Sequence, residues 1–218
     1  IYIYNDSSRE SKITSDDEEL SSISAKSMVS GIINRDFSPV DIAKSVIKKH
    51  DKYEKFSRSW ETFHPEKFLE LAKDCEKNIY ENGFTRTLEG VPIGIKDIFN
   101  TIDYPTQMGS PLWKGFTPGN DCRAVFNIKK SGAIVCGKTV TSEFAVHALN
   151  KSINPHKIDC TPGTSSSGSA VSIAMGMTPV TLGTQSAGSI IRPASFCGIY
   201  GFKPSFGLIP RTGILKTT

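Results

Sequence analysis

Two clusters of glycine and serine lie late in the chain, downstream of a lysine in the segment GVPIGIKD. The stretch 161–205 contains GTSSSGSA and SAGSIIRP, with an apolar segment between them. Small residues let the backbone approach a substrate carbonyl closely and direct amide N–H groups toward it. A serine hydroxyl can act as a nucleophile or carry a proton, and a lysine can act as a base where its surroundings keep it neutral. The combination predicts a hydrolase.

The order and spacing of these segments resemble those of the amidase signature enzymes, which are serine hydrolases with a Ser-Ser-Lys triad. The resemblance extends over residues 88–207 and is carried by LEGVPIGIKDIFNT, PTQMGS, KKSGAIVCGKTVTSEFA and PASFCGIYGFKPSFG together with the two clusters. It implies that Lys96 is the base, that Ser165 bridges base and nucleophile, and that Ser189 is the nucleophile. It also implies a cis peptide bond between Thr164 and Ser165. The implied oxyanion hole consists of the backbone N–H groups of Ser186, Ala187, Gly188 and Ser189.

The resemblance implies acyl transfer through a covalent intermediate on a serine. Neutral Lys96 would take a proton from Ser165, which would take one from Ser189, and the resulting alkoxide would attack an amide carbonyl. Ser165 would then protonate the departing amine or ammonia, and water would release the carboxylate. The expected enzyme is an amidase, a hydrolase of non-peptide C–N bonds, with a small-molecule amide as its partner and with no cofactor.

Two positions differ from the commonest pattern of the family and leave the subgroup open. Many members carry an acidic residue where this chain has Gln185, and an arginine one position earlier than Arg192. The chain resembles a T-Q-x-x-G-S-x-I-R-P variant of the same family. Gln185 and Ala187 disfavour the common form of the amidotransferase A subunit, which hydrolyses glutamine to supply ammonia for charged tRNA. That function remains an alternative beside aliphatic, aryl and fatty acid amides, carbamates and ureas as substrates.

Neighbouring residues have simpler interpretations than a catalytic one. Ser166 or Ser167 is expected to hydrogen-bond loop backbone. Arg192 is expected to be structural. Cys197 lies in the apolar stretch SFCGIYGF and is expected to be a buried small side chain, not a second nucleophile.

Two other motifs offer rival interpretations. Residues 132–139 fit G-x-x-x-x-G-K-[ST], the pattern of a phosphate-binding P-loop. A true P-loop follows a strand and opens a helix, whereas residues 133–136 themselves have the pattern of the strand, so nucleotide binding is a remote alternative. Residues 45–48 fit the S-x-x-K of penicillin-recognising enzymes. They lie in a helical pattern that begins at Ser38 and Pro39, and the sequence has no S-D-N or K-T-G partner.

The composition is that of an ordinary globular protein of 218 residues, 38% of them hydrophobic and 22% charged, with a formal net charge of +4. No basic patch is interleaved with aromatic residues, so nucleic acid is not an expected partner, and no apolar run of 18 residues could cross a bilayer. Five cysteines without a C-x-x-C pair and four histidines without ligand spacing favour a reducing, cytoplasmic location and no metal. A homo-oligomer and amidotransferase subunits stay open as partners.

Helical and strand patterns alternate along most of the chain. Residues 1–20 are polar and expected to be loosely ordered, apart from IYIY, which fits either a strand or leftover sequence. An α/β fold follows, with a mixed sheet flanked by helices and a helical N-terminal segment. Helices are expected at residues 24–34, 39–55, 65–82, 121–131 and 167–175, and strands at 91–99, 133–136, 179–183 and 199–202.

The last residue of the resembling pattern, Ser205, lies thirteen residues before the end of the sequence. Members of the family continue well beyond this point. Residues 21–218 are therefore interpreted as the N-terminal portion of a single amidase signature domain, with the C-terminal part of the fold missing. Such a fragment is expected to fold poorly alone, and a catalytically silent fragment is the alternative to an active enzyme.

Overall fold

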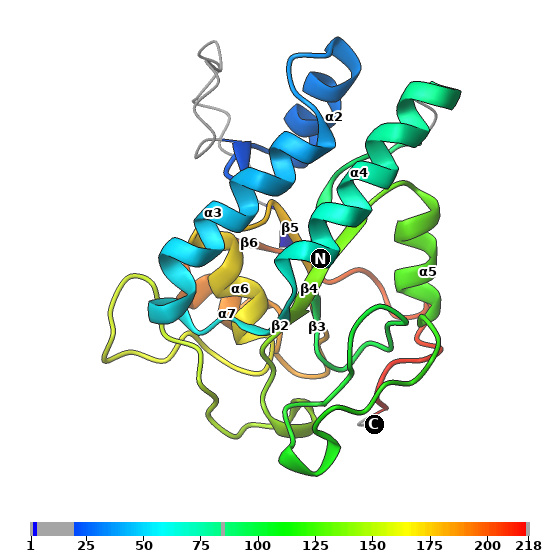
Figure 1. Ribbon diagram of the computed structural model, residues 1–218. Helices are drawn as coiled ribbons and strands as arrows, with labels where there is room; N and C mark the ends of the chain where they lie inside the picture. The colour runs from blue at the N-terminus through cyan, green and yellow to red at the C-terminus, as the bar shows by residue number, and fades with distance from the viewer. Residues whose placement is uncertain (1, 4–19, 84–85, 217–218) are drawn as a thin grey trace.

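The computed structural model of the chain describes residues 2–3, 20–83 and 86–216 (Figure 1). Its strands are Tyr2–Ile3 (β1), Trp60–Phe63 (β2), Pro92–Lys96 (β3), Ile134–Thr139 (β4), Val180–Leu182 (β5) and Tyr200–Gly201 (β6). They form one sheet in the order β2-β4-β3-β5-β1-β6. β3 is parallel to both β4 and β5, whereas β2 and β1 pair antiparallel with their neighbours. The predicted α/β fold with a mixed sheet is confirmed.

Helices flank this sheet (Figure 1). They are Ala25–Asn34 (α2), Pro39–Ser57 (α3), Pro65–Asn82 (α4), Arg123–Lys130 (α5), Ser167–Ala174 (α6) and Ile191–Phe196 (α7), with short 3-10 turns at Pro111–Trp113 and Glu143–Ala145. Helices α3 and α4 pack against each other, and α6 packs across β3, β4 and β5. Of the helices in the described ranges, none has the length and apolarity to span a membrane.

The N-terminal helices begin and end where their sequence signals place them. The Ser38 hydroxyl accepts a hydrogen bond from the Asp41 N–H at 3.2 Å, and the Asp41 carboxylate accepts one from the Ser38 N–H at 3.0 Å. This reciprocal capping box satisfies N–H groups that the first helical turn leaves unpaired, and Pro39 at the first position loses nothing by lacking one. Helix α4 ends at Asn82, as predicted, and Gly83 is the C-cap residue.

The central strands are buried over their whole length. Every residue of β3 and β4 is buried, without the alternation that a half-exposed strand shows. This is the pattern of parallel strands covered on both faces. Large apolar side chains from the helices, including Met28, Ile42 and Phe68, join Ile93 and Ile95 of β3 in one core. As a result, the lysine that ends β3 is held in a water-poor interior.

Several elements differ from the sequence-based expectation. Neither β2 nor α7 is predicted by the patterns, and β4 continues to Thr139, beyond the expected end at residue 136. Apart from residues 2–3 and residue 20, the segment expected to be loosely ordered lies outside the described residues. Of the two readings of IYIY, the strand fits, because Tyr2–Ile3 form β1.

The nucleotide-binding alternative at residues 132–139 is wrong. Gly137, Lys138 and Thr139 continue β4 and do not open a helix, and the Lys138 side chain is fully buried. The S-x-x-K serine, Ser45, is also buried in α3, where its hydroxyl accepts a hydrogen bond from the Ser21 N–H at 2.9 Å. Both motifs therefore belong to the framework of the fold.

Candidate active site

Lys96 ends β3 with its side chain wholly buried. Its Nζ lies 2.7 Å from the hydroxyl of Ser165, 2.9 Å from that of Ser166 and 2.8 Å from that of Thr184. No carboxylate of the described residues forms an ion pair with it. Because burial removes water and no anion compensates, the pKa of Lys96 lies well below its ordinary value of 10.5. The site thus holds an amine that favours its neutral form.

The hydroxyl of Ser166 forms hydrogen bonds with Lys96 and with the backbone of Thr184. It donates to the carbonyl oxygen of Thr184 at 3.2 Å and accepts from the N–H of the same residue at 3.3 Å. Since its proton points at that carbonyl, Ser166 meets Lys96 as an acceptor. A neutral amine has two N–H groups and one lone pair, so an N–H directed at Ser166 and another at Thr184 leave the lone pair facing Ser165.

Backbone contacts hold the two Gly/Ser clusters against each other. The N–H of Ser166 donates to the carbonyl oxygen of Ser189 at 3.3 Å. The peptide bond between Thr164 and Ser165 is cis, as the resemblance implies. Just before it, Gly163 has φ +83°, and a Cβ there would lie 2.8 Å from Cα of Pro193, so only glycine fits. The first cluster therefore lies directly on the start of α7.

A side chain closes the loop that carries the expected oxyanion hole. The Oε1 atom of Gln185 accepts hydrogen bonds from the N–H groups of Ile190 and Ile191, each at 2.9 Å. Arg192 contributes a backbone N–H to the Gly188 carbonyl at 2.8 Å. The backbone N–H groups of Ser186, Ala187 and Gly188 donate no hydrogen bond to any residue that the structure describes. The loop is thus fixed by its ends and leaves a row of donors unengaged.

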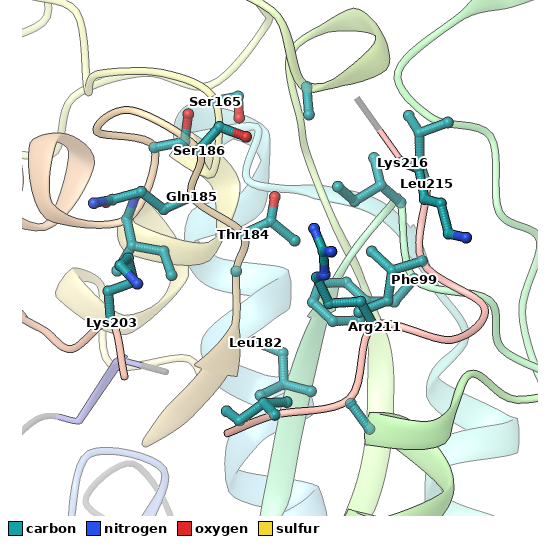
Figure 2. A pocket seen from close by; sticks show the side chains of 18 of the residues that line it. Phe99, Ser165, Leu182, Thr184, Gln185, Ser186, Lys203, Arg211, Leu215 and Lys216 are labelled. Atoms are coloured by element: carbon teal, nitrogen blue, oxygen red, sulfur yellow. The ribbon is translucent and has the colours of Figure 1, made fainter. Parts of the chain in front are cut away.

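These segments surround a cavity of about 400 Å³ (Figure 2). Its lining includes Ser165, Ser186 and Ser189, the hydroxyl-bearing Thr184, and the apolar side chains of Phe99 and Leu182. The carboxyl ends of β3 and β5 open into this region, which is where parallel α/β sheets usually bind ligands.

The structure brings the predicted residues to one place. Lys96 contacts Ser165 directly, and Ser165 shares the cavity with Ser186, Ala187 and Ser189, while Gly188 lies in the same loop. Sequence reasoning missed Thr184 and the contact between Ser166 and Lys96. The available signal for Thr184 was its position just after the strand expected at residues 179–183.

The simpler interpretations of Ser166 and Cys197 are confirmed. Ser166 does bond loop backbone, through Thr184, whereas Ser167 bonds the side chain of Asn150 at 3.0 Å. Cys197 is buried, its thiol donates to the Pro162 carbonyl, and burial raises the pKa of that thiol to about 12. A thiol with such a pKa is a poor nucleophile at neutral pH.

A second buried lysine lies near the first. The Nζ of Lys138 donates to the carbonyls of Phe99 and Pro105 and to the hydroxyl of Thr106, at 2.9–3.0 Å. It also lies 3.0 Å from Oδ1 of Asp97. Burial raises the pKa of Asp97 to about 6 and lowers the pKa of Lys138, while each opposes the shift of the other. This ion pair ties the loop that follows Lys96 to β4.

The chain is similar to known proteins in both sequence and fold. The family model for Amidase matches residues 41–218. The A subunit of glutamyl-tRNA(Gln) amidotransferase from Geobacter sp. (strain M21) is 37% identical over 187 residues, which is 83% of this chain and 38% of that protein. Its counterpart from Psychrobacter cryohalolentis is 36% identical over 90% of this chain and 41% of that protein.

Solved structures of other proteins have a similar fold. Peptide amidase from Stenotrophomonas maltophilia superposes with a TM-score of 0.81 at 29% identity, over 88% of this chain and 42% of that one. A fatty acid amide hydrolase superposes with a TM-score of 0.87 at 23% identity, over 93% and 37%, a likeness that shows the fold alone. The chain spans less than half the length of these proteins.

Proposed function

Because the chain belongs to the Amidase family, we propose that it carries the catalytic centre of an amide hydrolase that works through a serine acyl-enzyme. Ser189 is the nucleophile, Ser165 carries the proton, and Lys96 is the base. The observation that carries the proposal is the buried amine of Lys96, which lies 2.7 Å from the Ser165 hydroxyl with no carboxylate partner among the described residues.

The reaction begins with the lone pair of Lys96. It accepts the Ser165 proton while Ser165 accepts that of Ser189, and the Ser189 oxygen attacks the amide carbonyl. The transfers then reverse, so that Ser165 protonates the leaving amine or ammonia. In the second half, the same groups deprotonate water, which attacks the ester on Ser189 and releases the carboxylate.

The oxyanion formed in each half is stabilised by backbone donors. The donors are the unengaged N–H groups of residues 186–188 and the N–H of Ser189. The loop does not have to change its conformation when the oxyanion forms, because hydrogen bonds to Gln185 and from Arg192 already fix it. Loss of a single such donor typically costs about 3–4 kcal/mol of transition-state stabilisation.

Glutamine hydrolysis for an amidotransferase is the second candidate. The names of the amidotransferase relatives at 36–37% identity favour it, and the other subunits of such a complex would then be its partners. Gln185 and Ala187 disfavour it, as the sequence indicates. Co-purification with partner subunits, and a glutaminase rate that rises when they are added, would favour it over a stand-alone amidase.

All five cysteines are free thiols, four of them buried. Unpaired thiols persist best in a reducing compartment, which supports a cytoplasmic location.

Labelling with a fluorophosphonate tests the proposal. This reagent forms a bond to an activated serine, and we expect it on the peptide that contains Ser189. Ser189→Ala should abolish labelling and turnover, whereas Ser195→Ala, an exposed serine on α7, should retain both. Full labelling of the Ser189→Ala protein at another serine would refute the assignment of the nucleophile.

A further inference from the structure

The acidic and basic side chains that line the cavity beside the three serines are all basic. Lys203, Arg211 and Lys216 line it, and among its described lining residues none is Asp or Glu. No salt bridge within the described ranges involves any of these three cations. The cavity therefore carries positive charge that no acidic side chain of the described residues neutralises through a salt bridge.

The segment that carries Arg211 and Lys216 is anchored as a wall of the cavity. The N–H of Asn100 donates to the carbonyl of Gly213, and the N–H of Leu215 donates to the carbonyl of Ile98, each at 3.0 Å. Phe99 and Ile214 form an antiparallel bridge between these two bonds. The wall is thus hydrogen-bonded to residues 98–100, which lie just beyond Lys96 and the end of β3.

The side chains of the cations are directed by local contacts. The guanidinium of Arg211 lies 4.6 Å from the ring centre of Phe206, a cation–π contact that orients its planar face. The Nζ of Lys203 donates to the Pro204 carbonyl at 2.6 Å. Figure 2 shows Lys203 on one side of the pocket and Arg211 on the other, with Ser165 and Ser186 near its far end.

Apolar walls strengthen the effect of these charges. Phe99, Leu182 and Ile190 contribute low-dielectric surface to the same cavity. Cations set in such a cleft raise the local concentration of anions and attract them from solution. The fork of an arginine matches the two oxygens of a carboxylate, which allows paired charge-assisted hydrogen bonds.

We propose that the substrate carries a carboxylate in addition to the amide that reacts, that Arg211 binds that carboxylate, and that Lys203 and Lys216 add to the positive potential of the cavity. This inference rests on the proposed amide hydrolysis and names its substrate class as monoamides of dicarboxylic acids. Glutamine is a weaker ligand than its analogue without the amino group, because its α-ammonium group faces the same three cations.

Binding to the Ser189→Ala protein tests this without turnover. The probes are 4-carbamoylbutanoate, its near-isosteric neutral counterpart 5-methylhexanamide, and glutamine, with succinamate and adipamate to cover other lengths, measured by titration calorimetry. We expect the best anionic amide to bind about tenfold or more tighter than its neutral counterpart, the size of effect that a hydrogen-bonded charge pair gives. That preference should shrink at high salt.

A matched pair of variants locates the effect. Arg211→Gln in the same background should remove most of the preference for the anion, whereas Lys26→Gln, which removes an exposed charge on α2, should preserve it. Equal affinities for the anionic and neutral amides, tighter binding of glutamine than of 4-carbamoylbutanoate, or a preference that Arg211→Gln leaves intact would overturn the inference. Labelling of Ser189 is a separate measurement, so a failure here leaves the proposed hydrolysis standing.

Discussion

Two buried lysines on neighbouring strands have opposite surroundings. Lys138 pairs in register with Ile95, the residue before Lys96, and neither lysine side chain is exposed to solvent. Lys96 meets three hydroxyls, whereas Lys138 meets two carbonyls, one hydroxyl and the carboxylate of Asp97. The two sites share their burial and differ in the charge that faces them.

The difference shows how one sheet can give the same side chain two different electrostatic surroundings. Removing an ammonium group from water is costly, and a nearby carboxylate repays much of that cost. The carboxylate of Asp97 opposes the lowering of the pKa of Lys138 by burial, whereas Lys96 has no such carboxylate and burial alone lowers its pKa. Asp97 follows Lys96 in sequence, yet its carboxylate faces Lys138, as expected where successive residues of an extended chain point to opposite sides.

The largest effect is expected for Lys96→Met. A side chain of similar length without the amine removes the proposed base, and we expect kcat/KM to fall by about 10³-fold, within the usual range for such a base. Because no buried anion is left behind and folding no longer has to remove a proton from this side chain, thermal unfolding at neutral pH should show a stability at least equal to that of the wild type. A Lys96→Met protein that turns over amide at the wild-type rate would refute the role of the amine.

The lowered pKa of Lys96 should also make the stability of the protein depend on pH. The unfolded chain holds the Lys96 proton up to about pH 10.5, whereas the native state releases it at lower pH because its pKa is lowered. Between these two values the unfolded state binds more protons, so this residue makes the free energy of unfolding rise with pH. The contribution is lost as pH falls through the native pKa. Denaturant titrations across this window should show the rise in the wild type and a smaller rise in Lys96→Met.

Lys138→Met, unlike Lys96→Met, should lower the stability of the fold. It leaves the carboxylate of Asp97 buried without its cation, a change that typically costs about 3–5 kcal/mol of folding free energy. Chemical denaturation measures this loss directly. The double variant Lys138→Met with Asp97→Asn removes both charges and should recover a large part of the stability. If the single variant were as stable as the wild type, the pair would not hold the framework together.

The same two lysines mark how far the sequence alone could predict the site. Lys96, Ser165 and Ser189 are recognisable because they stand in long matching segments in a fixed order. Lys138 instead fits a short P-loop pattern, and only the register of β4 shows that it is buried in a strand. The pattern contains no information about Asp97 as its partner, because their contact joins residues 41 positions apart in sequence.

Contacts between distant segments also explain the missed elements. Helix α7 has six residues and includes Pro193, which by composition alone argues against a helix. Pro193 is tolerated in the first turn, where N–H groups lack helical partners, and Gln185 satisfies the N–H groups of Ile190 and Ile191. The four residues of β2 form a strand through their pairing with β4. Local patterns predict the long helices and buried strands, whereas these short elements depend on tertiary partners.

The smallest effect expected concerns the hydroxyls around Lys96. Thr184→Val keeps the shape of the side chain and removes one of the two acceptors that turn the lone pair of the amine toward Ser165. A neutral hydrogen bond contributes about 1 kcal/mol, so we expect kcat/KM to fall by about five- to tenfold. Thr184→Ser retains the hydroxyl and should restore most of the rate. The pH–rate profiles decide between positioning and simple packing, because a misdirected amine changes the apparent pKa of the base whereas a packing defect does not. If the valine and serine variants had the same rate and the same profile, Thr184 would not orient Lys96, and the contrast between the two lysines would rest on Asp97 alone.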